Sequence, residues 1–591
     1  MSSSAMTTFL TRRAWLLALL VAIPVIIPLL RPGWFEGHDD FHIFRLIEYD
    51  AALRDGQIPP RWFPDIHGGR GNPHPIYYAP LFYMAAELFH LAGFGLVGAL
   101  KAALILATLG ASIAMFRYAR LFFDPPAALV SAAAYTYIPY HLLDLYVRQA
   151  FSEYSVFVFL PLMLHAIHRL RFKGTRFDLV LAALAIAAMS VSHTITTMLV
   201  PPILLAYACL LSLPALSATR AFEWRWLRQA WIAAVIGYAI AGWFLVPAFL
   251  ERDSINLAVY TEGYLDFHKH FVHPLQLLWS EWGFGISLEG LKDGISFRLG
   301  FAAIAGTILA AVGLPRLRHR SSGRVPHVVF FLLLAALALL MTTSISTAIW
   351  ETLPPLRFLQ FPWRFLTLTT LSMGFLCGAA WQSLTGAAAS NGARAWTGAL
   401  VLCALLPVTA AAGGLLDVNR WVLPGRIAFT EKMYLNLIDA GEAAAPVMLD
   451  SAYVRGHTLH WIDHLPPGVS HLESTSAEME GPRVIVESGE AAISRVSERT
   501  ASLSFHLTAT SPSRVRVNVY AFPGWAARMD GAPLPIEEPA RRPRLIRLEV
   551  PAGDHDVSLA FERTPARRLG DGLTLAGLAS LALAGLFPSR R

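Results

Sequence analysis

The feature that most constrains this chain is a series of apolar runs, several of which reach the roughly 20 residues needed to cross a bilayer core. Hydrophobic residues make up 55% of the 591 residues and charged residues only 15%, whereas a soluble domain carries about 25% charged residues. Much of the surface must therefore face lipid. The runs predict twelve spanning helices, at about 14–31, 98–117, 127–146, 150–167, 177–195, 196–214, 229–250, 299–315, 327–348, 364–385, 396–415 and 569–587.

Basic residues near the ends of these runs predict the side of the membrane on which each loop lies. Loops rich in Arg and Lys favour the cytoplasmic side, and an even number of spans places both chain ends there. The run 77–94 is interrupted by Glu87 and His90, so we expect a juxtamembrane or re-entrant segment. The basic clusters are Arg12–Arg13, Arg169–Arg176, Arg220–Arg228, Arg316–Arg324 and Arg590–Arg591.

These loops account for the net charge of +7. No basic cluster is interleaved with stacking aromatic residues in a soluble module, so nucleic acid is not expected as a partner. The run 14–31 follows two arginines, as in a signal peptide, but no small-residue cleavage site comes after it. We therefore expect this first helix to be retained.

The predicted topology divides the chain into three parts. Residues 1–415 form a transmembrane domain with outer loops at 32–97 and 251–298, residues 416–566 form an extracytoplasmic domain, and residues 567–591 form a final anchor. The extracytoplasmic domain shows the period-two alternation of a small β-sandwich. The alternating residues are Leu503, Phe505, Leu507, Val515, Val517, Val519, Val557, Leu559 and Phe561, with turns at Pro523-Gly524 and Asp530-Gly531.

Charged side chains gather at the outer ends of the predicted helices, where they are costly unless they are paired or solvated. They lie in the outer loop 32–97, at the turn 139–153 and in the segment 349–364. The first loop could simply be solvated, Arg148 and Glu153 could simply pair, and interfacial arginines often extend to the headgroups. The candidate residues are His38, Asp39, Asp40, His42, Arg45, Arg61, His74, Arg148, Glu153, Arg357, Gln360 and Arg364.

One chemistry uses this combination: the transfer of a sugar from a lipid-linked phosphate donor to an acceptor hydroxyl. Asp39, Asp40 or Glu153 would take the acceptor's proton as a catalytic base. The other candidates would bind the substrate and its lipid phosphate, whose developing charge arginine balances well. The apolar helices would hold the donor's polyprenyl tail among the membrane lipids.

Metal binding has less support in the sequence. Neighbouring Asp39 and Asp40 could bind a divalent cation such as Mg²⁺ or Mn²⁺. The three histidines His268, His270 and His273 lack a regular zinc spacing. The three cysteines each lie inside an apolar run and are most simply small hydrophobic residues.

Three motifs and the tail of the chain carry a family resemblance. The motifs are His38-Asp39 through His42, Arg45, Pro60-Arg61-Trp62, Pro73 and Pro80-Leu81; Tyr146-Val147-Arg148-Gln149-Ala150 with Glu153; and Gln360-Phe361-Pro362-Trp363-Arg364. They resemble bacterial membrane proteins labelled "6-pyruvoyl-tetrahydropterin synthase-related". The tail is similar to that of YfhO-type membrane proteins, in Phe522-Pro523-Gly524-Trp525, Asp530-Gly531 and Pro551-Ala552-Gly553-Asp554-His555.

Both groups resemble the GT-C superfamily of membrane glycosyltransferases, which use polyprenyl-phosphate sugars. The resemblance implies seven shared helices, an active face outside the bacterial cytoplasmic membrane, and a base in the first outer loop, at Asp39 or Asp40. It implies inverting transfer to an extracytoplasmic acceptor, such as an envelope glycan, a lipid or a protein. Neither the sugar nor the acceptor follows from it. This chain has Gln149 where the family usually has glycine, which leaves the shape of the second loop open.

Two other classes of function remain open. A translocator of a lipid carrier or polysaccharide would distribute charges through the depth of the bilayer, whereas the charges found here gather at one face. A non-catalytic envelope scaffold would act through its β-rich domain, and deletion of 417–566 would then abolish its function.

Overall fold

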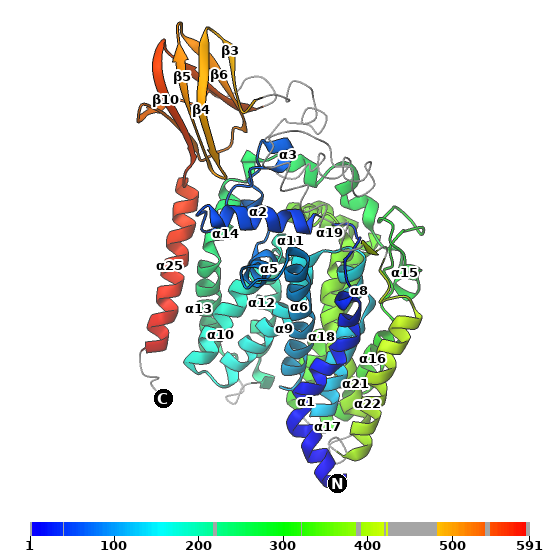
Figure 1. Ribbon diagram of the computed structural model, residues 1–591. Coiled ribbons are helices and arrows are strands. Elements are labelled where there is room, and N and C mark those ends of the chain that lie inside the picture. Colours follow the sequence, from blue (N-terminus) through cyan, green and yellow to red (C-terminus); the bar gives the residue numbers. More distant parts are fainter. Residues whose placement is uncertain are drawn as a thin grey trace.

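The computed structural model describes residues 3–39, 41–216, 221–320, 322–385, 392–418, 421–422, 482–537 and 544–586. Figure 1 shows a bundle of helices with sheets gathered at one end, and α2 (His42–Arg54) lies across that end. The start of α1 (Ser3–Ile26) and the end of α25 (Pro565–Leu586) both lie at the opposite end of the bundle. This arrangement agrees with an even number of crossings between them.

The helices of the bundle follow the predicted apolar runs, with several additional breaks. After α1 come the 3-10 turn η1 (Ile27–Leu30), α3 (Ile66–Gly69), α4 (His74–Tyr77), α5 (Leu81–Leu91), α6 (Leu96–Ala119), α7 (Pro125–Tyr137), α8 (Pro139–Tyr146), α9 (Phe151–Phe172), α10 (Arg176–Ser190), α11 (Thr194–Thr197), α12 (Val200–Leu211), α13 (Trp224–Ile240) and α14 (Gly242–Leu250). Then follow α15 (Pro274–Leu278), α16 (Phe301–Val312), α17 (Leu314–Arg320), α18 (Val325–Thr342), α19 (Thr347–Thr352), α20 (Pro354–Arg357), the 3-10 turn η9 (Pro362–Phe365), α21 (Leu366–Thr385) and α22 (Ala393–Ala412).

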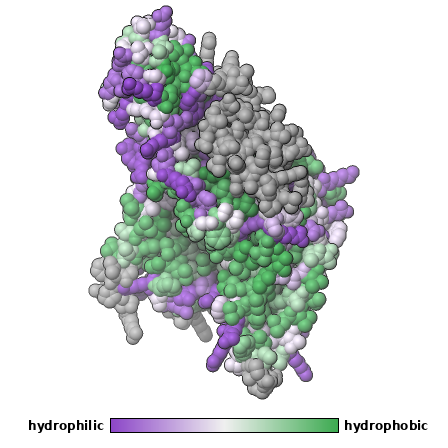
Figure 2. Space-filling view, in the orientation of Figure 1, coloured by the Kyte–Doolittle hydropathy of each residue, from purple (hydrophilic) through white to green (hydrophobic). Residues whose placement is uncertain are grey.

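Five helical segments in the described residues are long and apolar enough to cross a membrane: Met6–Leu30, α6, α9, α18 and α22. The pair α13 and α14 adds a sixth if its 74° bend lies within one span. Figure 2 shows hydrophobic residues over much of the bundle, whereas hydrophilic residues predominate on the sheets. The protein is a multi-pass membrane protein, and the total of twelve spans stays a prediction.

Several of the predicted helices are interrupted, among them 127–146 and 229–250, and the sequence did not predict these breaks. The run 127–146 breaks at Ile138, whose extended backbone (φ −60°, ψ 129°) precedes Pro139, because proline disfavours the helical conformation in the residue before it. The run 229–250 bends by 74° between α13 and α14. The 77–94 segment contains only the 11-residue α5, which at about 1.5 Å per residue is too short to cross a bilayer alone.

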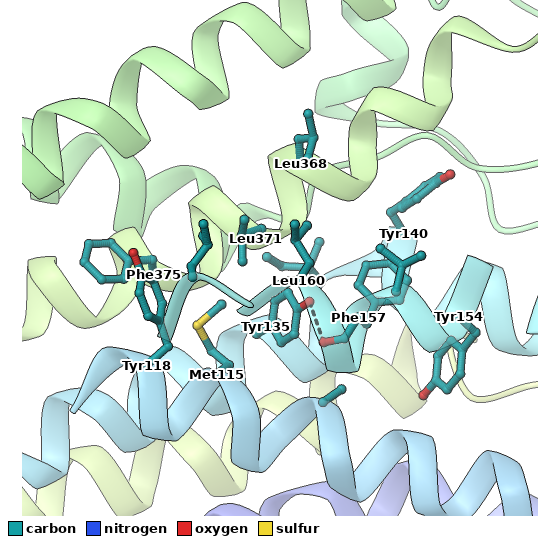
Figure 3. Close-up of a cluster of buried hydrophobic side chains, with 14 of the residues drawn as sticks. Met115, Tyr118, Tyr135, Tyr140, Tyr154, Phe157, Leu160, Leu368, Leu371 and Phe375 are labelled. Atoms are coloured by element: carbon teal, nitrogen blue, oxygen red, sulfur yellow. Dashed lines mark hydrogen bonds between the residues drawn. The ribbon is translucent and has the colours of Figure 1, made fainter. Parts of the chain in front are cut away.

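Buried hydrophobic side chains from α6, α7, α8, α9 and α21 pack together in one cluster (Figure 3). Its tyrosines find partners for their hydroxyls: Tyr135 donates to the carbonyl of Phe157 over 2.9 Å. Such pairing is needed because the bilayer core offers no water to a polar group. The close approach of α21 to α7 requires Gly378, where a Cβ would lie 2.7 Å from the carbonyl oxygen of Ala127.

The C-terminal strands form the predicted sandwich-like domain. The strand order is β4-β5-β10-β7-β8 in one antiparallel sheet and β3-β6-β9 in the other. The strands are β3 (Val484–Ser488), β4 (Ala491–Arg499), β5 (Ser502–Ala509), β6 (Ser513–Tyr520), β7 (Trp525–Met529), β8 (Ala532–Leu534), β9 (Leu545–Val550) and β10 (Gly553–Phe561). All alternating apolar residues named above are buried in one core between the sheets, except Phe561, which is half-buried against it. Both Asp530 (φ 51°) and Gly531 (φ 82°) adopt the left-handed conformation, as a two-residue hairpin turn requires.

Several contacts fix the sandwich to the bundle, including the hydrogen bonds of Thr500 to Asp55 and of the Tyr520 amide to the Arg70 carbonyl, and two sets of them are buried. Trp62, Ile76 and Tyr77 of the first outer loop are buried in the sandwich core. At the start of α25, Arg567 Nη2 lies 3.0 Å from a carboxylate oxygen of Glu251, at the end of α14, and both side chains are almost fully buried. The predicted boundaries at 415, 416 and 566 stay predictions, since 423–481 lies outside the described residues.

Candidate functional site

The three segments that carry the predicted site residues meet at the end of the bundle covered by α2. The backbone of the first outer loop runs beside the turn between α8 and α9: the His38 amide donates to the Val147 carbonyl over 3.0 Å, and the Asp39 amide donates to the Arg148 carbonyl over 3.1 Å. The third segment, η9, contacts this turn through Trp363, whose ring lies 4.5 Å below the Arg148 guanidinium. The structure therefore joins loops that are more than 100 residues apart in the sequence.

Arg148 is the centre of a buried charge network. Its Nη1 donates to Glu153 over 2.9 Å and to the Tyr140 hydroxyl over 3.2 Å, and it also pairs with Asp144. The side chains of Asp144 and Glu153 are completely buried. Burial alone would lower the pKa of Arg148, but the two carboxylates raise it well above its ordinary value. The ion pair between Arg148 and Glu153 that the sequence left open is present.

Glu153 also connects this network to the third segment. Its Oε1 accepts from the Tyr140 hydroxyl over 3.0 Å and from Thr367 over 3.3 Å, while Arg364 Nε lies 3.8 Å from Oε2. Arg364 Nη1 donates to the Gln360 side chain over 2.9 Å. Both carboxylate oxygens of Glu153 are therefore occupied.

Asp39 lies among the arginines of all three segments. It interacts electrostatically with Arg45 on α2, with Arg148 in the turn and with Arg364 in η9. Unlike Glu153, Asp39 is only half-buried. Burial lowers the pKa of the neighbouring His38 from its ordinary value, although Asp39 acts in the opposite direction. The site thus combines an accessible carboxylate with buried, fixed positive charges.

His42 and Arg45 support this arrangement from α2. The two nitrogens of His42 lie 2.8 Å from the Tyr83 hydroxyl and 2.7 Å from the Gln149 carbonyl oxygen, and its ring stacks on Phe151 at 3.9 Å. Arg45 donates to the same Tyr83 hydroxyl over 3.1 Å. Burial lowers the pKa of His42 well below its ordinary value. Because His42 is completely buried, it holds the turn in place and does not face open space.

Two site residues hold strained backbone conformations. Gln149 (φ 52°) and Gln360 (φ 65°) are both left-handed, a conformation that costs roughly 1–2 kcal/mol for a residue with a Cβ. Glycine adopts a left-handed conformation without this cost. The backbone of Gln149 therefore explains why glycine usually occupies this position in the family that the sequence resembles. The Gln149 side chain donates to the Phe35 carbonyl over 2.5 Å, which offsets part of that cost.

We expect Gly37→Ala to displace the first loop from the second. A Cβ at Gly37 would lie 2.4 Å from Gln149 Cγ and 2.9 Å from the Val147 carbonyl oxygen, and overpacking of this kind costs about 1–3 kcal/mol. The thermal unfolding midpoint of the purified protein should fall, and Gly37→Ala with Gln149→Gly should recover part of the loss. Gly95→Ala, where nothing lies within 4 Å, is the control; equal midpoints for Gly37→Ala and Gly95→Ala would contradict this account.

Three of the predicted binding residues have other contacts. Arg61 donates to the Trp243 carbonyl over 2.8 Å and pairs with Asp571 at 3.3 Å, so it joins α14 to α25. His74 is buried and stacks on Tyr78 at 4.6 Å. Arg357 is exposed and donates to the Glu351 carbonyl over 3.2 Å. These contacts lie away from the Arg148 network, because the loops that carry the three residues turn towards other helices.

No group of three or more His, Cys, Asp or Glu side chains able to hold a metal ion occurs in the described residues. His268 contacts Asp266 and Glu351 at 2.7 and 3.4 Å, whereas His270 contacts Ser287 at 3.0 Å, so these two histidines diverge. Asp40 lies outside the described residues. A cation at Asp39 and Asp40 therefore stays a prediction.

Two polar residues of the network were missed in the sequence. Tyr140 and Thr367 both contact Glu153, but each lies in an apolar run and carries no charge that would single it out. Thr367 follows Arg364 by three residues, so helical spacing could have placed the two on one face.

No protein-family model matches this chain. An uncharacterized protein of Lactococcus lactis subsp. cremoris (strain MG1363) is 22% identical over 265 residues, which are 44% of this chain and 42% of that protein. The structure of the mycobacterial arabinofuranosyltransferase AftD aligns with 73% of this chain and 29% of its own, at 19% identity and a TM-score of 0.46. The oligosaccharyltransferase AglB from Archaeoglobus fulgidus, solved with an inhibitory peptide and a dolichol-phosphate, aligns with 76% of this chain and 60% of its own, at 14% identity and a TM-score of 0.42.

The chain thus spans less than half of the curated relative and less than two thirds of either solved structure. Both solved structures are those of enzymes that transfer sugars. TM-scores below 0.5 do not establish a shared fold, so a function must be argued from this chain's own residues. The narrower assignment to the pterin-synthase-related and YfhO-type group stays a prediction.

Proposed function

We propose that this protein transfers a sugar from a polyprenyl-phosphate donor to a hydroxyl acceptor, with Asp39 as the catalytic base. The observation that carries the proposal is the position of one half-buried carboxylate among Arg45, Arg148 and Arg364 at the end of a membrane helix bundle. That end is opposite to α17, with its basic residues (Figure 1), so the positive-inside rule favours an extracytoplasmic site.

The proposed reaction uses each charge in a defined way. Asp39 accepts the proton of the acceptor hydroxyl as the acceptor oxygen bonds to the anomeric carbon. The bond from that carbon to the phosphate oxygen breaks, and the lipid phosphate leaves with the bonding electrons. The fixed arginines stabilise this negative charge without reorganisation. Attack opposite to the leaving phosphate inverts the anomeric configuration.

Glu153 has a different role in this scheme. Its two oxygens already accept from Arg148, Tyr140 and Thr367, and its side chain is completely buried. We assign it to positioning the arginines, and we assign proton removal to Asp39. Asp40 stays the alternative base.

The test is transfer by an Asp39→Asn variant, which keeps the shape of the side chain but removes its basicity. Purified protein is incubated with a panel of undecaprenyl-phosphate-linked sugars and membrane extract as acceptor, and the release of undecaprenyl phosphate is measured. Loss of a general base lowers the rate by about 10²–10⁴-fold, while the thermal unfolding midpoint should stay near that of the wild type. Asp253→Asn is the matched control, because Asp253 is exposed in the 251–298 loop. Full transfer by Asp39→Asn would refute the assignment of the base.

A further inference from the structure

His193 lies at a break between two helices that the proposed mechanism does not yet use. α10 ends at Ser190 and α11 begins at Thr194. Non-helical backbone at membrane depth occurs where it is buried in protein or lines a cavity. The break is held in place by the segment before α5: the Thr194 hydroxyl donates to the Tyr77 carbonyl over 2.9 Å, and the Leu81 amide donates to the Val191 carbonyl over 3.2 Å.

The segment Tyr77–Leu81 also places the break between α10 and α11 beside the first turn of α9. Ala79 and Val191 are buried in one hydrophobic cluster, and the Ser152 hydroxyl contacts the Ala79 carbonyl at 3.4 Å. His193 accordingly interacts electrostatically with Glu153, Arg364 and Arg148. The half-buried imidazole therefore lies near the charge network of the candidate site.

The hydrogen bonds of His193 determine its tautomer. Its Nδ1 accepts from the Thr196 amide over 3.4 Å and lies 2.7 Å from the Thr196 hydroxyl, as the cap of α11. A neutral imidazole whose Nδ1 accepts carries its proton on Nε2. Within the described ranges, Nε2 has no hydrogen-bond partner. His193 thus presents a fixed N–H donor.

A second open donor lies beside the same carboxylate. Arg364 donates through Nη1 to the Leu359 carbonyl and to the Gln360 side chain. Its Nε lies 3.8 Å from Glu153. Its Nη2 has no hydrogen-bond partner in the part of the chain that the structure describes. The guanidinium also lies 4.9 Å from the Phe361 ring, which fixes its plane. A neutral N–H and a charged N–H thus approach the site from two different helices.

We propose that His193 Nε2–H and Arg364 Nη2 together bind the phosphate oxygens of the polyprenyl-phosphate donor. This inference rests on the proposed sugar transfer and names the residues that would hold its leaving group. Glu153 orients the arginine, and Thr196 orients the imidazole. His193 acts here as a binding residue that donates a hydrogen bond while staying neutral.

His193→Asn separates binding from capping. Asparagine is a good helix cap, so α11 and the thermal unfolding midpoint should be retained, but its shorter side chain places no donor where Nε2–H lies. We expect the affinity of the purified full chain for undecaprenyl phosphate, measured by tryptophan fluorescence in detergent, to fall about tenfold, as expected for loss of one hydrogen bond to a charged group. His193→Gln, with a longer amide, should restore part of the affinity.

The control is His273→Asn, because His273 also caps a helix through Nδ1, at α15. It should leave the affinity unchanged. Undecaprenol, which lacks the phosphate, is the second probe, and its binding should not respond to His193→Asn. Unchanged affinity of His193→Asn for undecaprenyl phosphate, or an equal loss for undecaprenol, would overturn the proposal.

These results are separable from those for Asp39. Asp39→Asn should still bind undecaprenyl phosphate, since it keeps both donors. If Asp39→Asn transfers normally while His193→Asn loses affinity, the phosphate site stands and the base assignment fails. If His193→Asn keeps its affinity while Asp39→Asn is inactive, the phosphate site is refuted and the base assignment stands.

Discussion

Replacement of Glu153 by alanine is expected to destabilise the protein by about 3–5 kcal/mol, the cost of removing one partner from a buried ion pair. The side chain of Glu153 is completely buried, and Arg148 beside it is only 8% exposed. Without this carboxylate, Arg148 keeps Asp144 as its ion-pair partner, and Arg364 loses the carboxylate that lies 3.8 Å from its Nε. The thermal unfolding midpoint in detergent should fall sharply, and sugar transfer should be lost with it.

Glu153→Gln distinguishes charge from hydrogen bonding. Glutamine keeps the shape and an oxygen that can accept from Tyr140 and Thr367, but it removes the negative charge. If the charge is what matters, most of the loss in stability should persist in this variant. A Gln variant as stable as the wild type would show that Asp144 alone neutralises the arginines. Glu281→Ala, at an exposed position of the 251–298 loop, should leave the midpoint unchanged.

The contrast between Glu153 and Asp39 shows which part of the candidate site could be predicted from sequence. Charges at the ends of apolar runs were expected to cluster, and the segments carrying Asp39, Arg148 and Arg364 do meet. A sequence, however, does not reveal how deeply a carboxylate is buried, and Glu153 is completely buried whereas Asp39 is half-buried. The residue types alone therefore left both Glu153 and Asp39 open as bases.

Elements that depend on single backbone conformations were harder to predict. Hydropathy over 127–146 is continuous, yet Pro139 divides it into α7 and α8, and this break brings Tyr140 to Glu153. Likewise, His193 reaches the site only because α10 ends at Ser190. The strands were predicted well, since their alternation is decided locally by which face each side chain occupies.

Arg61 shows a different limit of sequence analysis. Its motif, Pro60-Arg61-Trp62, lies in the same loop as Asp39, which favoured a role in substrate binding. In the structure Arg61 pairs with Asp571 and Trp62 is buried in the sandwich core. A motif can thus reflect an interface between distant parts of one chain instead of a substrate-binding site. Its proximity in sequence to a candidate base does not show which of these roles it has.

That interface leads to the second large expected effect, for Arg567→Ala. Arg567 and Glu251 are only 1% and 6% exposed, and the guanidinium donates to Glu251 over 3.0 and 3.2 Å and to the Pro523 carbonyl over 2.7 Å. The variant leaves Glu251 buried without its partner, which costs about 3–5 kcal/mol. It also removes the contact that joins α14, α25 and the first turn after β6.

The expected result is loosening of the sandwich on the bundle, with faster trypsin cleavage after the exposed Arg563. Cleavage is followed by mass spectrometry of the fragments, together with the thermal unfolding midpoint. Arg568→Ala is the matched control, because Arg568 is exposed one residue away. Glu251→Gln with Arg567→Met should be more stable than Arg567→Ala, since neither charge is then left buried alone. If Arg567→Ala and Arg568→Ala were cleaved at the same rate, the ion pair would not hold the sandwich in place, and its contacts with the first outer loop would be sufficient.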